Sequence, residues 1–265
     1  MKTAAMLRPG SVQLSKAPAL TRGAALEPRA LQVLEAEQYR ALSYTVEQFA
    51  KPNRTVIAIS SPVSGDGKTT TSINLARTLA QASESRVLLV DADLRRGNVG
   101  PQLGIGRSTS VGLAGAIADP ECRLETVVRR RANLNLSVLP AGTCPPLPYE
   151  ALRSPRVGVL LAEARQDYDY VLVDTSPVVP VADVRALSRW IDGFILVVMA
   201  HQTPSELLDE ALSAMDPQKV VGLVFNGDDV LLSRRYGRYY NYGEAVPAPG
   251  FWARVLGSAA SRGGR

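Results

Sequence analysis

Short apolar runs alternate with segments of helical spacing along most of the chain. The runs are rich in Val, Ile and Leu and cover residues 55–60, 86–90, 136–140, 170–174, 194–200 and 220–226. Runs of this length and composition predict strands that are buried on both faces. Segments 69–82 and 204–215 instead carry apolar residues at the spacing of a helix. The alternation predicts an α/β fold, a doubly wound and mainly parallel sheet with helices on both faces.

Three parts of different character divide the chain. Residues 1–28 mix Ala, Pro, Gly and basic residues without periodicity, which predicts a disordered basic arm. Residues 29–230 hold the periodic segments and predict one domain, beginning with an amphipathic helix over 29–50. Residues 231–265 lose the periodicity again and predict a flexible tail rich in Tyr and Arg.

Composition narrows the class of protein. The 265 residues are 46% hydrophobic and 21% charged, as in folded domains. The longest apolar run, Phe194 to Ala200, is far shorter than the roughly 20 residues of a membrane-spanning helix. We also expect no secretory signal, because the basic N-terminus lacks an apolar segment. Two separate cysteines, Cys122 and Cys144, and one histidine exclude a disulfide scaffold and a zinc cluster, and favour a cytoplasmic location.

Basic residues gather at the two ends of a chain whose formal net charge is +5. Residues 1–30 hold five Lys and Arg against one Glu, and residues 231–265 hold six Arg against one Glu. Basic tails bind anionic lipid, acidic proteins or nucleic acid, or they stay solvated. Charge alone leaves these interpretations open.

A phosphate-binding loop follows the first predicted strand. Residues 60–70 read SSPVSGDGKTT, the order of strand, glycine-bearing loop, GK[ST] and helix that a P-loop requires, although Pro62 stands at its usual first glycine. The loop N–H groups and the helix N-terminus would face phosphate oxygens. Lys68 can reach the β- and γ-phosphates, and Thr69 can ligate Mg²⁺. The predicted ATP-binding residues are Ser64, Gly65, Asp66, Gly67, Lys68, Thr69 and Thr70, with Asn226 at the end of the last predicted strand.

Aspartates follow two other predicted strands. Asp91 and Asp93 end the second strand, and Asp174 ends the fourth. Ligands of parallel sheets bind at the carboxyl ends of the strands. Three carboxylates gathered there would repel one another without a cation, and Mg²⁺ with a nucleotide supplies one. A single aspartate at a strand end is usually a helix cap, but this set accompanies a P-loop and therefore predicts a fold of the P-loop NTPase type.

These motifs resemble those of a known family, the bacterial tyrosine kinases (BY-kinases) of capsule and exopolysaccharide export. The resemblance covers residues 35–245 and includes the loop SGDGKTT without a first glycine. VLLVDADLRR at 87–96 and VLVDTSPV at 171–178 look like the second and third motifs of the family. PAGTCPPLPYEAL at 140–152 is similar to its PAGxxPPNPxELL stretch, and YGRYYNYGE at 236–244 looks like its tyrosine cluster.

The resemblance implies roles for the acidic and basic residues. Lys68 and Thr69 would hold the phosphates and Mg²⁺. Asp93 and Asp174 would organise Mg²⁺, so that the metal residues are Thr69, Asp93 and Asp174. Asp91 would be the base for an incoming tyrosine hydroxyl. The implied catalytic residues are thus Lys68, Asp91, Asp93 and Asp174.

The resemblance also implies a substrate and partners. The substrate would be the tail of a neighbouring copy in a ring, with acceptors Tyr236, Tyr239, Tyr240 and Tyr242. The family works with a membrane polysaccharide co-polymerase whose cytoplasmic segment activates the kinase. We therefore expect a homo-oligomer that lies at the inner face of the cell membrane through its partner.

The tail supports this interpretation on its own residues. Four of the nine tyrosines lie within residues 236–242, interleaved with Arg, Gly and Asn, which form no apolar face. Such a segment is suited to entering the active site of another subunit. Interleaved Arg and Tyr are also typical of RNA-stacking segments. No nucleic-acid-binding motif accompanies them, so we expect no nucleic-acid partner.

The chain departs from the family pattern at three places. The family's ExxRxxR helix motif is present at residues 37–43 with Ser43 in place of its second Arg, which weakens the ring prediction. Glu37 and Arg40 share a helix face and are expected to pair. Ser176 stands where the family commonly has Pro, and Leu147 stands where its PPNP stretch has Asn. Neither change removes a carboxylate or a phosphate contact.

Two other classes stay open at this point. Partition and division-site ATPases share the fold, but they carry a lysine at the position of Val63 that crosses a dimer interface to the partner's phosphates. An uncharged side chain cannot supply that contact. The second class is a nucleotide-binding scaffold without catalysis, because a fold alone does not prove activity. Intact Lys68 and the three aspartates disfavour it.

Overall fold

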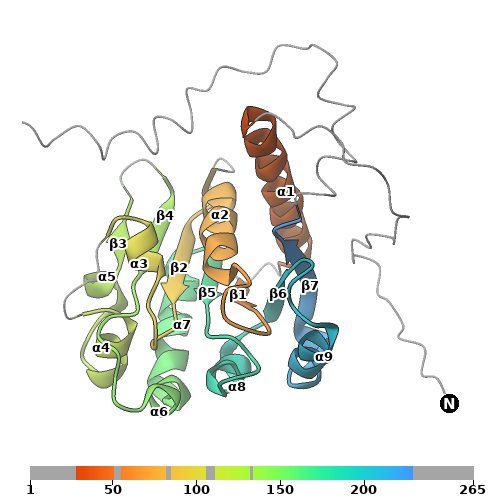
Figure 1. The fold of residues 1–265 in the computed structure, drawn as a ribbon. Helices are drawn as coiled ribbons and strands as arrows, with labels where there is room; N and C mark the ends of the chain where they lie inside the picture. The colour runs from red at the N-terminus through yellow and green to blue at the C-terminus, as the bar shows by residue number, and fades with distance from the viewer. Residues whose placement is uncertain (1–27, 51–54, 82–84, 106–110, 132–133, 229–265) are drawn as a thin grey trace, which may run out of the picture.

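The computed structural model describes residues 28–50, 55–81, 85–105, 111–131 and 134–228. The predicted arm, apart from Pro28, and the predicted tail with its tyrosine cluster lie outside these residues. The described part has the α/β architecture that the apolar pattern predicts, with helices on both faces of one sheet (Figure 1).

The sheet has seven strands in the order β3-β4-β2-β5-β1-β6-β7. Neighbouring strands are parallel except for β3 and β4, which pair antiparallel. β1, β2 and β4 are buried along their whole length because helices cover both faces. The strands span Thr55–Ser60 (β1), Val87–Asp91 (β2), Arg129–Arg130 (β3), Leu136–Leu139 (β4), Tyr170–Asp174 (β5), Gly193–Met199 (β6) and Val220–Asn226 (β7).

Two apolar cores lie on the two faces of the sheet. One core joins the sheet to α1 (Pro28–Phe49), α2 (Lys68–Gln81) and α3 (Val99–Gln102). The other core joins it to six further helices. These helices are α4 (Leu113–Ala118), α5 (Leu124–Val127), α6 (Pro148–Arg153), α7 (Pro155–Asp167), α8 (Asp183–Leu187) and α9 (Ser205–Ser213). Short 3₁₀ turns follow α8 (Ser188–Trp190) and precede β7 (Pro217–Lys219).

The predicted elements agree closely with the observed ones. The six predicted strands are present with their ends shifted by at most one residue, and the predicted helices over 69–82 and 204–215 correspond to α2 and α9. The sequence did not indicate β3, because its two residues are exposed arginines without any apolar alternation. Helices α3 to α8 were also not assigned individually, since most of them are only four to six residues long.

The N-terminal helix α1 packs against α2 on the sheet. Glu37 and Arg40 form the expected ion pair on its exposed side. The Ser43 hydroxyl, in place of the second arginine of the family motif, donates a hydrogen bond of 2.9 Å to the Arg40 carbonyl of its own helix. The helices that the structure describes include none with the length and apolar character needed to cross a bilayer.

Candidate active site

The P-loop joins β1 to α2 at the end of the sheet where the parallel strands terminate. β1 ends at Ser60 and α2 begins at Lys68. Gly67 has a φ of +92°, and a Cβ there would lie 1.9 Å from Asn226 Nδ2, so this position accepts glycine alone. Asn226 Nδ2 in turn donates to the Asp66 carbonyl over 3.0 Å. The predicted nucleotide residue Asn226 therefore lies directly on the loop.

The buried carboxylate of Asp66 joins the loop to the segment that follows β6. Its Oδ2 accepts from the Val63 N–H at 3.1 Å, and its Oδ1 accepts from the Thr203 hydroxyl at 2.6 Å. The Met199 N–H donates to Thr203 Oγ1 from the end of β6. These bonds fix the loop conformation before any ligand binds. Thr203 belongs to a loop with no recognisable motif, so the sequence did not indicate it.

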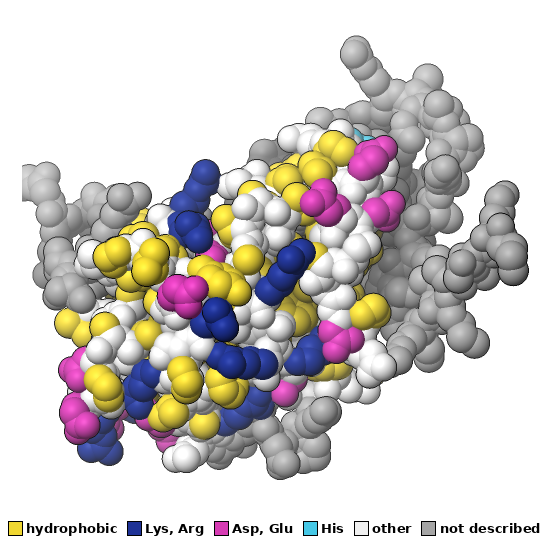
Figure 2. Space-filling model, turned by 90° about the horizontal axis from the view of Figure 1, so that it is seen from below, with side chains coloured by type: hydrophobic (Ala, Val, Ile, Leu, Met, Phe, Trp, Pro, Cys, Tyr) yellow, Lys and Arg dark blue, Asp and Glu magenta, His cyan; other side chains and the backbone are white. Residues whose placement is uncertain are grey.

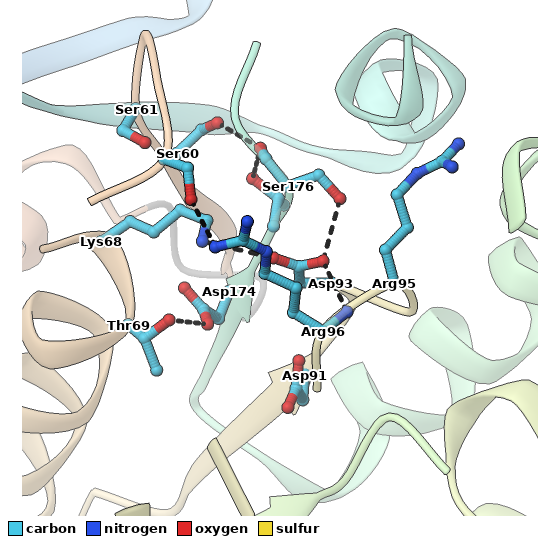
Figure 3. Close-up of polar contacts among 12 residues, drawn as sticks. Ser60, Ser61, Lys68, Thr69, Asp91, Asp93, Arg95, Arg96, Asp174 and Ser176 are labelled. Atoms are coloured by element: carbon cyan, nitrogen blue, oxygen red, sulfur yellow. Dashed lines mark hydrogen bonds and ion pairs between the residues drawn. The ribbon is translucent and has the colours of Figure 1, made fainter. Parts of the chain in front are cut away.

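Four predicted residues meet beside this loop (Figure 3). Lys68 Nζ lies 3.3 Å from Asp93 Oδ2, and both side chains are less than a tenth exposed. The Thr69 hydroxyl donates to Asp174 Oδ2 at 2.7 Å. The other oxygen of Asp174 accepts from the Ser72 hydroxyl at 3.0 Å, a contact one helical turn beyond the motif that the sequence did not indicate.

Asp91 is almost fully buried and lies beside Asp174. β2 and β5 pair in parallel with Asp91 opposite Asp174, so both side chains point to the same face of the sheet. Asp91 Oδ2 accepts from the Val99 N–H at 3.0 Å, whereas Oδ1 is buried without a hydrogen-bond partner. Burial first, and then the nearby Asp174 carboxylate, raise the pKa of Asp91 to about 8. The site is therefore short of positive charge.

The pKa of Asp174 is also raised, but less than that of Asp91. Burial raises its pKa to about 6, although Lys68 and the hydroxyls of Thr69 and Ser72 lower it. Within the described ranges, no three Asp, Glu, His or Cys side chains converge as a protein-only metal cage. Mg²⁺ is usually bound by one or two carboxylates together with substrate phosphates. The hydroxyl and carboxylates of Thr69, Asp93 and Asp174 fit that mode of binding.

Comparisons with known proteins agree with this geometry. Residues 54–206 match the model of a family described as an AAA domain. Tyrosine-protein kinase YwqD of Bacillus subtilis is 35% identical over 217 residues, which cover 80% of this chain and 88% of the relative. The chain belongs to the bacterial tyrosine-protein kinases. This finding decides between the classes that the sequence left open, in favour of a kinase.

Two further relatives place the kinase in a wider group. The kinase domain of Escherichia coli tyrosine kinase ETK superposes with a TM-score of 0.67 at 28% identity, covering 72% of this chain and 75% of that structure. The succinoglycan biosynthesis transport protein ExoP of Rhizobium meliloti is 31% identical over 77% of this chain. The matched region makes up 28% of that longer protein. The relatives of this chain therefore include tyrosine kinases and a transport protein of polysaccharide biosynthesis.

A second layer of polar residues supports Asp93 in the kinase. Ser176 Oγ lies 3.4 Å from Asp93 Oδ1 and 3.1 Å from Asp183 Oδ2. Asp183 begins α8, is fully buried, and accepts two bonds from Arg95, at 2.7 and 3.1 Å. The single Ser176 proton can serve only one carboxylate at a time. The serine that replaces the family's usual proline therefore links Asp93 to Asp183.

Substituting Ser176 by alanine is expected to lower the free energy of unfolding by about 0.5–1.5 kcal/mol, because a buried carboxylate oxygen loses one of its two donors. Urea unfolding of the ligand-free kinase measures this change. Ser176→Thr keeps the hydroxyl and is the matched control. Equal stability of the alanine variant and the wild type would show that Asp93 and Asp183 do not depend on this hydroxyl.

The remaining predicted residues are either exposed at the site or lie outside the part of the chain that the structure describes. Ser64, Gly65 and Thr70 are exposed, as expected for the mouth of a phosphate-binding loop. Figure 2 shows this end of the molecule, where Lys and Arg side chains lie among acidic and apolar ones. The predicted acceptors Tyr236, Tyr239, Tyr240 and Tyr242 lie outside the described residues.

Proposed function

We propose that this kinase transfers the γ-phosphoryl group of ATP to its own C-terminal tyrosines, with one copy modifying the tail of another. The observation that carries the proposal is the convergence of Lys68, Thr69, Asp93 and Asp174 beside the P-loop. The same residue types hold the phosphates and the metal ion in phosphoryl-transfer enzymes.

Each residue has a role that its position supports. Lys68 would exchange its ion pair with Asp93 for the β- and γ-phosphates. Thr69, Asp93 and Asp174 would hold Mg²⁺, which neutralises phosphate charge when it is bound. Asp91 would accept the phenolic proton of the incoming tyrosine. Its raised pKa means that the ligand-free carboxyl is largely protonated at pH 7, so it needs the positive charge of the loaded site to act as a base.

The position where the chain leaves the sheet supports the tail as acceptor. β7 ends at Asn226, whose amide contacts the P-loop. Tyr236 follows ten residues later, a span of at most about 35 Å when extended. That reach includes the active site of the same copy, and transfer between copies requires a second active site within the same distance of Asn226. Among the alternative acceptors, Tyr44 is 61% exposed on α1, whereas Tyr39 is partly buried and its burial raises its pKa.

The assembly is part of the same proposal. We expect the kinase to form a ring, to be activated by the cytoplasmic segment of a membrane polysaccharide co-polymerase, and to lie at the inner face of the membrane through that partner. The link of ExoP to succinoglycan transport supports the role in polysaccharide export. The exposed Glu37–Arg40 pair on α1 offers a charged surface for contacts between copies.

Mixing two variants tests transfer between copies. One keeps its tail but carries Lys68→Met, and the other is active but carries Phe at all four tail tyrosines. We expect phosphotyrosine on the tail of the Lys68→Met protein after addition of ATP and Mg²⁺, because its partner supplies a working site. Mass spectrometry locates the phosphate, and each variant alone is the control.

Two outcomes of the mixing experiment contradict the proposal. Phosphate found only on tyrosines outside positions 236–242 would move the acceptor elsewhere, with Tyr44 the first position to test. Absence of phosphotyrosine in the mixture, while the wild type modifies its tail, would mean that each copy phosphorylates only itself.

A further inference from the structure

A second cationic side chain lies on the P-loop. The loop itself, residues 60–70, has Lys68 as its one basic residue. Arg96 comes from the turn after β2, and its Nη1 donates to Ser64 Oγ at 2.7 Å. Figure 3 shows the Arg96 side chain extending toward the loop, whereas that of its neighbour Arg95 extends the other way. Two arginines that are adjacent in sequence therefore serve different parts of the site.

The backbone of Arg96 is held by the site itself. Its N–H lies 3.2 Å from Asp93 Oδ1 and 3.1 Å from the Asp93 carbonyl. The Gly97 N–H donates to the same carbonyl at 2.8 Å, and Gly97 has a φ of +54°, which closes the turn. Arg95 is fixed by its two bonds to Asp183. The Arg96 side chain thus leaves from a fixed backbone position, while its guanidinium is exposed and free to change partners.

Phosphoryl transfer needs more positive charge than Lys68 provides. Lys68 is paired with Asp93 in this structure, and its charge also acts on the buried carboxyl of Asp174. In the transition state, charge spreads over the three outer oxygens of the transferring group. An arginine that contacts these oxygens raises the rate by 10³–10⁵ in related P-loop enzymes, whether the same chain or a partner supplies it. The planar guanidinium of an arginine can donate hydrogen bonds to two phosphate oxygens at once.

We propose that Arg96 is a further catalytic residue, which leaves Ser64 and donates to the γ-phosphoryl oxygens during transfer. The bond between Pγ and the β–γ bridging oxygen breaks and leaves ADP, while a bond forms between Pγ and the tyrosine Oη. The phenolic proton passes to Asp91, and Arg96 keeps its own protons and charge throughout. The inference rests on the proposed transfer to tyrosine for its chemistry, but its position rests only on the contacts with Ser64 and Asp93.

Arg96→Ala tests the role. We expect the rate of phosphotyrosine formation at saturating ATP to fall at least 100-fold, while the affinity for Mg·ADP changes less than threefold. Aluminium fluoride, which mimics the transferring phosphoryl group, should tighten ADP binding to the wild type but not to Arg96→Ala. Arg96→Lys keeps the positive charge but loses the planar guanidinium. Its rate of phosphotyrosine formation should lie between those of the wild type and Arg96→Ala. Arg86→Ala is the matched control, since Arg86 pairs with Asp169 outside the site.

Three results overturn the role. Arg96→Ala with wild-type transfer would show that the arginine is dispensable. An equal loss of Mg·ADP affinity with and without aluminium fluoride would make Arg96 a ground-state contact. A change confined to the KM of a tail peptide would make it a contact for the acceptor. These results differ from a failure of the proposed function. In that case the wild type would form no phosphotyrosine, but aluminium fluoride would still tighten ADP binding to the wild type and not to Arg96→Ala.

Discussion

Lys68→Met is expected to reduce phosphotyrosine formation by on the order of 10²- to 10³-fold, because the variant removes a charge aimed at the transferring phosphoryl group. The lysine is 8% exposed and pairs with Asp93, so its charge acts in a site largely closed to water. Phosphotyrosine measured against time with saturating ATP and Mg²⁺ gives the ratio of rates. Transfer at the wild-type rate would refute the assignment of this site.

The same substitution has a structural effect that needs its own control. Removing one partner of a buried ion pair costs about 3–5 kcal/mol, because the other charge stays buried without compensation. Lys68→Met is therefore expected to unfold at lower urea concentration than the wild type. Adding Asp93→Asn removes the unpaired charge and should restore much of this stability without restoring transfer. Recovery of both together would mean that the single variant lost activity only because it was unstable.

Asp91→Asn is expected to stabilise the ligand-free kinase at pH 8 while it lowers phosphoryl transfer. The pKa of Asp91 is about 8 in the folded protein, against 3.8 as its ordinary value. A raised carboxyl pKa means that the folded state holds the proton more tightly, so stability falls as the pH rises from about 4 to about 8. Asparagine does not titrate, so the variant lacks this pH-dependent loss of stability.

The size of this effect follows from the window between the two pKa values. Each pH unit within it is worth about 1.4 kcal/mol, so the advantage of the variant should grow by on the order of 3 kcal/mol between pH 5 and pH 8. Urea unfolding without Mg²⁺ or nucleotide at both pH values measures it. Asp174, whose pKa is raised to about 6, is present in both proteins and mainly affects them equally. A difference that is independent of pH would contradict the buried, protonated state of Asp91.

The same variant tests the role of Asp91 as the base. Transfer should fall by more than the affinity for ATP, because a base acts on the acceptor proton and not on nucleotide binding. A large loss of ATP affinity with normal turnover of bound ATP would instead place Asp91 in the nucleotide site.

Consecutive residues were enough to predict the P-loop and the sheet. The loop is one segment, SSPVSGDGKTT, whose order of strand, glycines, lysine and helix start is local. The strands were recognisable because parallel strands buried on both faces need uninterrupted apolar runs. The strand ends also placed Asp91, Asp93 and Asp174 at one edge of the sheet. These features depend on neighbours in the chain, so the sequence determines them without knowledge of the packing.

Only the tertiary structure decided which polar groups meet. Asp91 and Asp174 face each other because β2 pairs with β5, an order that no local pattern specifies. The adjacent arginines Arg95 and Arg96 are equivalent in sequence, yet one binds Asp183 and the other Ser64. Ser72, Thr203 and Asp183 look like ordinary polar residues until packing buries them beside the site. Periodicity reports which face of an element is buried, whereas the partner of a buried polar atom depends on how distant elements pack together.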